Sequence, residues 1–281
     1  MNYFVNADDF GLNQYRNEAV VYSFQKGISS KTSLIINSEF TEEAVELSKK
    51  YDFFDKVGLH INITEGIPLT VGLKEIRSYC NEDSTFVNTS PRSLLKVFSL
   101  SHIKVLRSEI EAQIKKYLDY GFTLPYIDTH NDIIFNLPVW YALEPLLLKY
   151  DISVIRGIEP YLFGYYRKSI LSYLPLKYYF MMRYFKKKAN KTKIIGGGRN
   201  INQFVCDMEN SRTKRIGDIN KLKLIEIIIH PDFDGKKYID RTNFLKNNNT
   251  LIYNTLADTA MKISRFEMNK IECADICSYL Y

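Results

Sequence analysis

Three of the four histidines in the sequence stand at the ends of short apolar runs that are typical of buried β-strands. They are His60 in VGLHINITEG, His130 in YIDTHNDII and His230 in IEIIIHPDF, and an acid pair, Asp8 and Asp9, ends a fourth run in NADDFGL. In parallel α/β architectures the carboxyl ends of the strands converge on one face, where sites are built. We therefore expect two carboxylates and three imidazoles on one rim, which could bind a divalent metal and leave groups for proton transfer.

Each residue alone also has an ordinary structural explanation. The acid pair could be a turn that caps the following helix, and a lone histidine at a strand end is more often structural than a ligand. His230 precedes a proline, which could simply end the strand. The joint placement of all five on equivalent ends is what favours a site. The fourth histidine, His102, has no partner nearby in the sequence and is interpreted as a surface residue.

The elements that must position these residues alternate along the chain. Continuous apolar strands separated by helices predict an α/β fold with a parallel sheet covered on both faces, either open or closed into a (β/α) barrel. The predicted strands are Tyr3–Asn6, Thr32–Asn37, Val57–Ile63, Tyr126–Thr129, Ser153–Ile155, Lys193–Ile195 and Leu224–His230. The predicted helices are Gln14–Lys26, Thr41–Lys50, Ser101–Tyr120, Pro138–Tyr150 and Thr242–Met261.

Composition limits the class of protein. The 281 residues are 46% hydrophobic and 25% charged, the mixture of an ordinary globular domain, which excludes disorder and coiled coils. No run of 18 uncharged apolar residues exists, which excludes a membrane-spanning helix. Four cysteines without CxxC spacing favour a reducing compartment, and the N-terminus lacks the regions of a secretory signal. We expect a single cytoplasmic domain over residues 1–281.

Five motifs together resemble the YdjC-like (ChbG-type) carbohydrate deacetylases. They are NADDFGL at the N-terminus, GLHINITEGIPLT at 58–70, IDTHND at 127–132, IRGIEP at 155–160 and IEIIIHPDF at 225–233. They occur in the order of the family and span most of the chain. The resemblance implies a (β/α)-barrel-like fold of the TIM type, irregular or seven-stranded. It also implies hydrolysis of N-acetyl groups on a sugar or oligosaccharide with one divalent metal ion, Mg²⁺ or Zn²⁺.

The resemblance also implies a role for individual residues. Asp9, His60 and His130 match the metal ligands of the family, and Asp8 matches its general base. The C-terminal strand motif makes His230 a candidate general acid. Arg156 matches an arginine beside the sugar site, where it would bind substrate.

One motif departs from the family, which usually has DSHxHxH where this chain has Asp128-Thr129-His130-Asn131-Asp132-Ile133-Ile134. In an extended strand, residues two apart share a face, so His130, Asp132 and Ile134 would line one side of the pocket. Asp132 could still bind substrate or metal, whereas Ile134 could do neither. This leaves open a carbohydrate-binding homologue without turnover, and a different metal-dependent hydrolase, such as a phosphoesterase, on the same ligands.

A basic, aromatic insertion around residues 161–199 contains no Asp or Glu. Three interpretations stay open: barrel helices with aromatic cores and solvated lysines, a lid over the sugar, or attachment to anionic lipid through residues 178–188. No motif indicates nucleic-acid binding. The expected partner is an N-acetylated sugar, and the resemblance suggests a homodimer.

Overall fold

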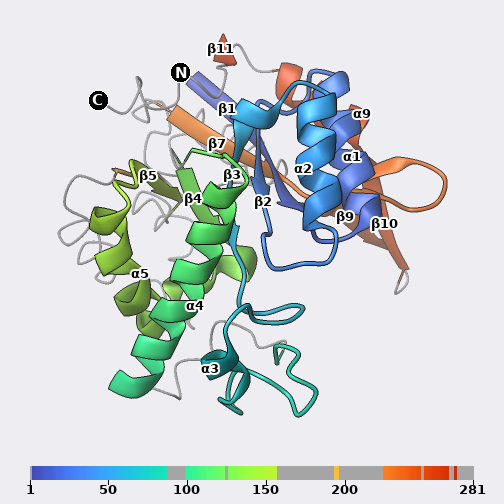
Figure 1. Ribbon diagram of the computed structural model, residues 1–281. Helices are drawn as coiled ribbons and strands as arrows, with labels where there is room; N and C mark the ends of the chain where they lie inside the picture. Colours follow the sequence, from blue (N-terminus) through green and yellow to red (C-terminus); the bar gives the residue numbers. More distant parts are fainter. Residues whose placement is uncertain are drawn as a thin grey trace, which may run out of the picture.

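A curled sheet of parallel strands forms the centre of the molecule (Figure 1). The computed structural model describes residues 2–87, 99–123, 126–156, 193–195, 224–247, 250–265 and 269–270. The strands of this sheet are β1 (Asn2–Phe10), β2 (Lys31–Leu34), β3 (Val57–Ile61), β4 (Tyr126–Thr129), β5 (Val154–Arg156), β6 (Lys193–Ile195), β7 (Leu224–Ile229) and the short β11 (Asn269–Lys270). Neighbouring strands pair in the order β7-β1-β2-β3-β4-β5-β6, with β11 beside the start of β1, and every described pair is parallel.

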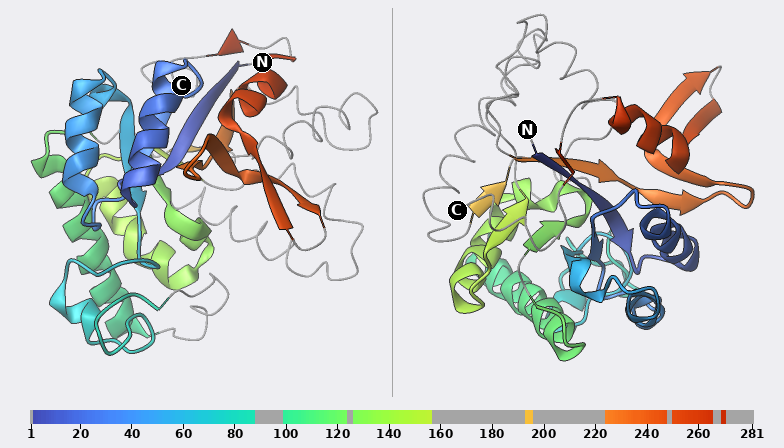
Figure 2. Two further views of the ribbon diagram at one scale, coloured as in Figure 1. Left: turned by 90° about the vertical axis from the view of Figure 1, so that its right-hand side faces the viewer. Right: turned by 90° about the horizontal axis from the view of Figure 1, so that it is seen from above.

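The sheet curls so far that strands distant in the pairing order touch through their side chains. β4 and β7 are four steps apart, which is about 19 Å in a flat sheet at about 4.8 Å per step. Yet the Tyr126 hydroxyl donates to Glu226 Oε1 over 2.6 Å, and Arg156 on β5 reaches the same oxygen. The predicted α/β fold is therefore confirmed as a curled parallel half-barrel (Figure 2). Closure of the barrel stays a prediction, because none of the described pairings joins β6 to β7.

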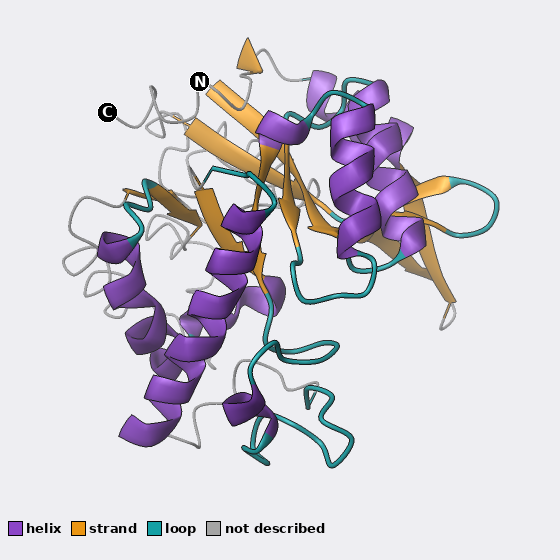
Figure 3. Cartoon of the chain, in the orientation of Figure 1, coloured by secondary structure: helices purple, strands orange, loops and turns teal. Residues whose placement is uncertain are grey.

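Helices cover the outside of the sheet (Figure 3). α1 (Gln14–Gln25) and α2 (Thr41–Lys50) lie beside each other, and α4 (Leu100–Asp119) and α5 (Leu137–Lys149) form a second pair. Shorter turns are η1 (Phe54–Lys56), α3 (Val71–Lys74) and η3 (His130–Phe135). Among the described residues, no helix combines the length and apolar character needed to cross a bilayer.

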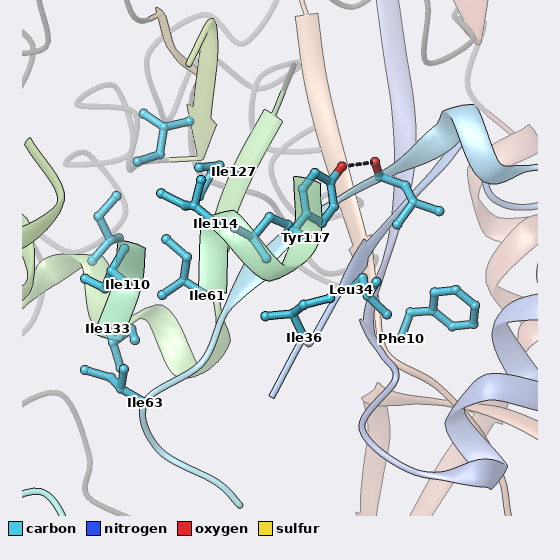
Figure 4. Close-up of a cluster of buried hydrophobic side chains, with 14 of the residues drawn as sticks. Phe10, Leu34, Ile36, Ile61, Ile63, Ile110, Ile114, Tyr117, Ile127 and Ile133 are labelled. Atoms are coloured by element: carbon cyan, nitrogen blue, oxygen red, sulfur yellow. Dashed lines mark hydrogen bonds between the residues drawn. The ribbon is translucent and has the colours of Figure 1, made fainter. Parts of the chain in front are cut away.

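The spacing of apolar residues in α4 explains how it packs. Ile103, Leu106, Ile110, Ile114 and Tyr117 recur every three or four residues, so they share one helix face, and all five are buried. This face packs in a cluster with isoleucines of β3 and β4 (Figure 4). The Tyr117 hydroxyl donates to the backbone carbonyl of Val57 over 2.7 Å, so the buried phenol is hydrogen-bonded.

The predicted helix over Thr242–Met261 is wrong for most of its length. β8 (Pro231–Phe233), β9 (Tyr238–Asn247) and β10 (Thr250–Thr255) form an antiparallel sheet, and α9 (Leu256–Ser264) begins only after it. The helix starts where a capping box becomes available, with Thr255 and Asp258 bonding each other's backbone N–H groups. β9 pairs with β8, which directly follows β7 of the curled sheet, and β10 pairs with β9, so the residues before α9 are extended.

Candidate metal centre

The acid pair and the three strand-end histidines lie together at the carboxyl rim of the curled sheet. Asp9 Oδ1 lies 2.8 Å from His130 Nδ1 and 3.3 Å from His60 Nε2. These three buried residues, called here the ligand cluster, offer ligand atoms within 4.8 Å of one another. His230 Nε2 lies 3.8 Å from Asp8 Oδ2 and 4.0 Å from Asp9 Oδ2. The structure thus brings together the five residues that the sequence predicted for one rim.

A backbone irregularity explains how two consecutive residues both reach the site. Successive side chains of a strand normally point to opposite faces, yet Asp8 and Asp9 are both buried beside the histidines. Asp9 has a φ of 67°, in the left-handed region, and the register between β1 and β2 shifts here. Gly11 follows with a φ of 84°, and a Cβ there would lie 2.8 Å from the carbonyl oxygen of Ile35. The DDFG sequence therefore needs its glycine.

In each histidine of the ligand cluster, the ring nitrogen that does not face Asp9 lies close to a second carboxylate. His60 Nδ1 lies 2.6 Å from Asp128 Oδ1. When the proton sits on this nitrogen, the lone pair of Nε2 is directed towards Asp9. On the other ring, His130 Nε2 lies 3.2 Å from Glu65 Oε1. Histidine ligands of metals typically donate their second N–H to a carboxylate, which fixes the tautomer and the ring orientation. The His60–Asp128 pair has this hydrogen bond, whereas Glu65 approaches His130 as an ion-pair partner without hydrogen-bond geometry.

The electrostatics of the pocket also fit a cation. Burial would lower the pKa of His60, but the charge of Asp128 and hydrogen bonds to Asp128 and Asp9 raise it to about 10. Burial likewise opposes protonation of His130, whereas Asp9 and Glu65 raise its pKa to about 9. For Asp9, burial opposes ionisation, but the neighbouring histidines hold its pKa well below the usual range. A pocket that draws protons onto two buried imidazoles has the negative potential that a divalent ion would neutralise, so the residues present fit a metal.

Arg156 holds Asp8, the carboxylate of the acid pair that is not in the ligand cluster. Its Nη1 donates to Asp8 Oδ2 and its Nη2 to Asp8 Oδ1, both over 2.7 Å, which makes a bidentate salt bridge. The same guanidinium contacts Asp128 at 2.8 Å and Glu226 at 2.7 Å. Although burial alone would lower the pKa of the arginine, these carboxylates raise it well above its usual value. The observed contacts of Arg156 orient Asp8; its expected contact with a sugar is a separate prediction that they do not test.

The expected extended conformation of residues 130–134 is wrong. His130–Phe135 form the 3₁₀ turns of η3, with Asn131 at a φ of 54° and Asp132 at 53°. Asn and Asp tolerate this left-handed region better than other residues with a side chain. The turn buries Ile134 in the hydrophobic core. The side chain of Ile134, where this chain departs from the family motif, therefore does not line the site. Asp132 is exposed, two residues after His130 in the same turn.

Sequence reasoning missed several residues of the site. Asp128 and Glu65 lie inside the quoted motifs. Asp128 stands two residues before His130 and Glu65 five residues after His60, and this short spacing was a signal that could have singled them out. Arg16, on α1, is buried with Nη1 3.6 Å from Asp9 Oδ2, and no motif pointed to it. The insertion predicted around residues 161–199 lies outside the described residues, apart from the strand β6.

Comparisons with known proteins identify relatives. A family model described as "YdjC-like protein" matches residues 3–264. A carbohydrate deacetylase of Halalkalibacterium halodurans is 34% identical over 159 residues, which are 57% of this chain and 65% of the relative. A carbohydrate deacetylase of Clostridium beijerinckii is 29% identical over 154 residues, 55% of this chain and 59% of the relative. The matches thus span less than two thirds of the length of these relatives.

A solved structure has a similar fold. The crystal structure of a protein from Enterococcus faecalis V583, described as a cellobiose-phosphate cleavage protein, matches with a TM-score of 0.60 at 18% identity. The match covers 83% of this chain and 81% of that one. At this identity the likeness concerns the fold alone, and it agrees with the curled parallel sheet.

Proposed function

The chain belongs to the YdjC-like protein family, and from this premise we propose that it is a metal-dependent hydrolase that removes the acetyl group from an N-acetylated sugar or oligosaccharide. The observation that carries the proposal is the ligand cluster of Asp9, His60 and His130 directly beside Asp8 and His230. The names of the relatives support the acetylated-sugar substrate.

The ligand cluster would hold the metal ion. Two imidazole nitrogens favour Zn²⁺ or another transition ion, while a carboxylate with bound waters also suits Mg²⁺. When bound, such an ion polarises a carbonyl group and lowers the pKa of a bound water. Asp128 and Glu65 would orient the two rings from behind.

Asp8 is the proposed general base. Its carboxylate is held from both oxygens by Arg156 and also accepts a hydrogen bond from Asn6, so it cannot rotate away. A carboxylate has four lone-pair sites, which leaves capacity to accept a proton from the attacking water. Arg156 would thus act by positioning the base, and Asp132 at the rim would contact the sugar.

His230 is the proposed general acid. Its Nε2 lies 3.8 Å from Asp8 Oδ2, so the acid and the base face the same small volume. The water oxygen bonds to the acetyl carbon and gives a proton to Asp8, while the C–N bond breaks and His230 gives a proton to the nitrogen. The products are acetate and an amine. Each proton transfer is worth roughly 10²–10⁴ in rate.

Acetate release tests the proposal. The purified chain should release acetate from N-acetylglucosamine oligomers, lose this activity with a chelator and regain it with a divalent ion. A chain that binds the oligomer but releases no acetate with any divalent ion would instead be the carbohydrate-binding homologue. The homodimer and the cytoplasmic localisation stay predictions, and the lipid contact proposed for residues 178–188 lies outside the described residues.

A further inference from the structure

Arg16 joins two parts of the rim that are far apart in the sequence. Its Nη1 lies 3.6 Å from Asp9 Oδ2 and donates to the backbone carbonyl of Pro231 over 3.1 Å, across 215 residues. Its Nε lies 3.8 Å from Asp232 Oδ2. The side chain is 9% exposed, so water screens these contacts little. One guanidinium from α1 therefore links the end of β1 to the first residues of β8.

Within the part of the chain that the structure describes, the imidazole of His230 makes no hydrogen bond. Its Nδ1 is buried without a partner there, and its Nε2 lies 3.8 Å from Asp8 Oδ2 and 4.0 Å from Asp9 Oδ2, beyond hydrogen-bond distance. The backbone, in contrast, is held on both sides. Its N–H donates to Asp240 Oδ1 and its carbonyl accepts from the Arg241 N–H, both over 3.0 Å. The ring therefore takes its position from the backbone of this segment.

An alternating row of charges connects that backbone to the ligand cluster. Asp232 accepts a hydrogen bond from Arg241 on β9 and faces Arg16 on its other side, and Arg16 in turn faces Asp9. Arg16 is the only member of the row that contacts both β1 and β8. Without it, Asp232 keeps Arg241, but no side chain in the row ties the β8 backbone to Asp9.

We propose that Arg16 is a positioning residue that sets the place of the His230 imidazole relative to Asp8 and Asp9 by tying the β8 backbone to Asp9. The inference rests on the proposed function, in which His230 protonates the departing amine. Loss of the tie would leave Asp8 in place, because Arg156 holds that carboxylate independently.

Hydrogen–deuterium exchange tests the tie without any substrate. Arg16→Met, which removes the charge and keeps much of the side-chain volume, should speed amide exchange in peptides covering residues 228–241 and leave α4 unchanged. Arg107→Met is the matched control, since Arg107 also ties two elements through backbone carbonyls, those of Tyr141 and Ala142, and joins α4 to α5 instead of β1 to β8. Unchanged exchange over 228–241 in Arg16→Met would overturn the proposal.

Kinetics test whether Arg16 acts through His230. Arg16→Met should lower kcat on an N-acetylglucosamine trimer by roughly 10²-fold, the lower end of what one proton transfer is worth. Hydrolysis of 4-nitrophenyl acetate should stay near the wild-type rate, because nitrophenolate leaves without a proton. Equal slowing of both reactions would indicate a general loss of structure and would overturn the proposed role of Arg16.

A double variant completes the test. Adding Arg16→Met to His230→Gln should cost little further activity on the trimer, because the two residues serve one proton transfer. A full additional loss would overturn the proposal. If the wild-type chain releases no acetate from any N-acetylated sugar, the proposed function fails, whereas the exchange measurement still decides whether Arg16 holds the His230 segment.

Discussion

His60 and Asp128 are directly paired residues on the neighbouring strands β3 and β4, and their side chains meet with Nδ1 and Oδ1 2.6 Å apart. Parallel register thus places a carboxylate behind the ring whose other nitrogen faces Asp9 at 3.3 Å. The pairing keeps a proton on Nδ1 through the sheet itself, so Nε2 is the nitrogen that gives up its proton when an ion binds.

Asp128→Asn should weaken metal binding by roughly 10–100-fold, the usual cost of losing a partner behind a histidine ligand. An amide can present either its N–H or its oxygen to Nδ1, so the tautomer with a free Nε2 lone pair is no longer imposed. Titration calorimetry with Zn²⁺ measures the change. Asp55→Asn, at an exposed aspartate just before β3, is the control and should bind as the wild type does; equal affinity in both variants would contradict the assigned role.

Asp8→Asn and His60→Ala should separate turnover from metal binding. The asparagine variant removes the proposed base but leaves the ligand cluster, so it should retain metal while acetate release falls to background. His60→Ala removes one of three ligands, so it should lose the metal together with the activity. Metal analysis of both purified proteins decides, and the opposite pattern would exchange the roles of the two residues.

The raised pKa values of His60 and His130, about 10 and about 9, predict how stability depends on pH in the presence of a chelator. The unfolded value is near 6.5, so their contribution is fully present below pH 6.5 and is lost as pH rises through 9–10. The melting temperature should therefore fall between pH 7 and 10, and less steeply in His130→Gln. His102→Gln, outside the site, should follow the wild type, and parallel curves for all three proteins would refute the assignment.

A divalent ion should reverse this trend. One nitrogen of each ring, His60 Nε2 and His130 Nδ1, must be free of its proton to act as a ligand. Metal binding therefore releases protons at neutral pH and strengthens as pH rises towards 9. Proton release is read from the buffer dependence of the binding enthalpy. A binding enthalpy that is the same in buffers of different ionisation enthalpy would contradict this prediction.

The sequence alone was sufficient for the elements whose signals are local. α2 and β4 have the predicted bounds, and β7 ends at Ile229, one residue before the predicted end at His230. The rim followed from one general rule, that the carboxyl ends of parallel strands converge. Residue types at those ends were enough to predict which side chains meet.

Other features depend on contacts between distant segments, and local patterns carry no trace of them. β9 pairs along the edge of β8 and β10 along the edge of β9, which no periodicity within these strands reveals. Arg16 looks like an ordinary helix residue until the fold places it between Asp9 and Pro231. The turn at Asn131 and Asp132 follows from burying Ile133 and Ile134, which only the finished core requires.

Gly11→Ala should destabilise the protein more than Gly235→Ala, although both glycines have a φ near +85°. An alanine in this region costs about 1–2 kcal/mol at either position. At Gly235 nothing lies within 4 Å of the new Cβ, whereas at Gly11 the Ile35 carbonyl oxygen and a Leu34 methyl lie at 2.8 Å. Overpacking of this kind adds about 1–3 kcal/mol.

The clash at Gly11 also bears on the site. Relief requires the backbone after Asp9 to move, and Asp9 is the carboxylate that both histidines of the ligand cluster share. Gly11→Ala should therefore lose metal affinity as well as stability, and Gly235→Ala should lose only the smaller amount of stability. Urea denaturation and Zn²⁺ titration of the two variants give both quantities; equal losses of stability, or unchanged affinity in Gly11→Ala, would show that the DDFG turn does not hold Asp9 in place.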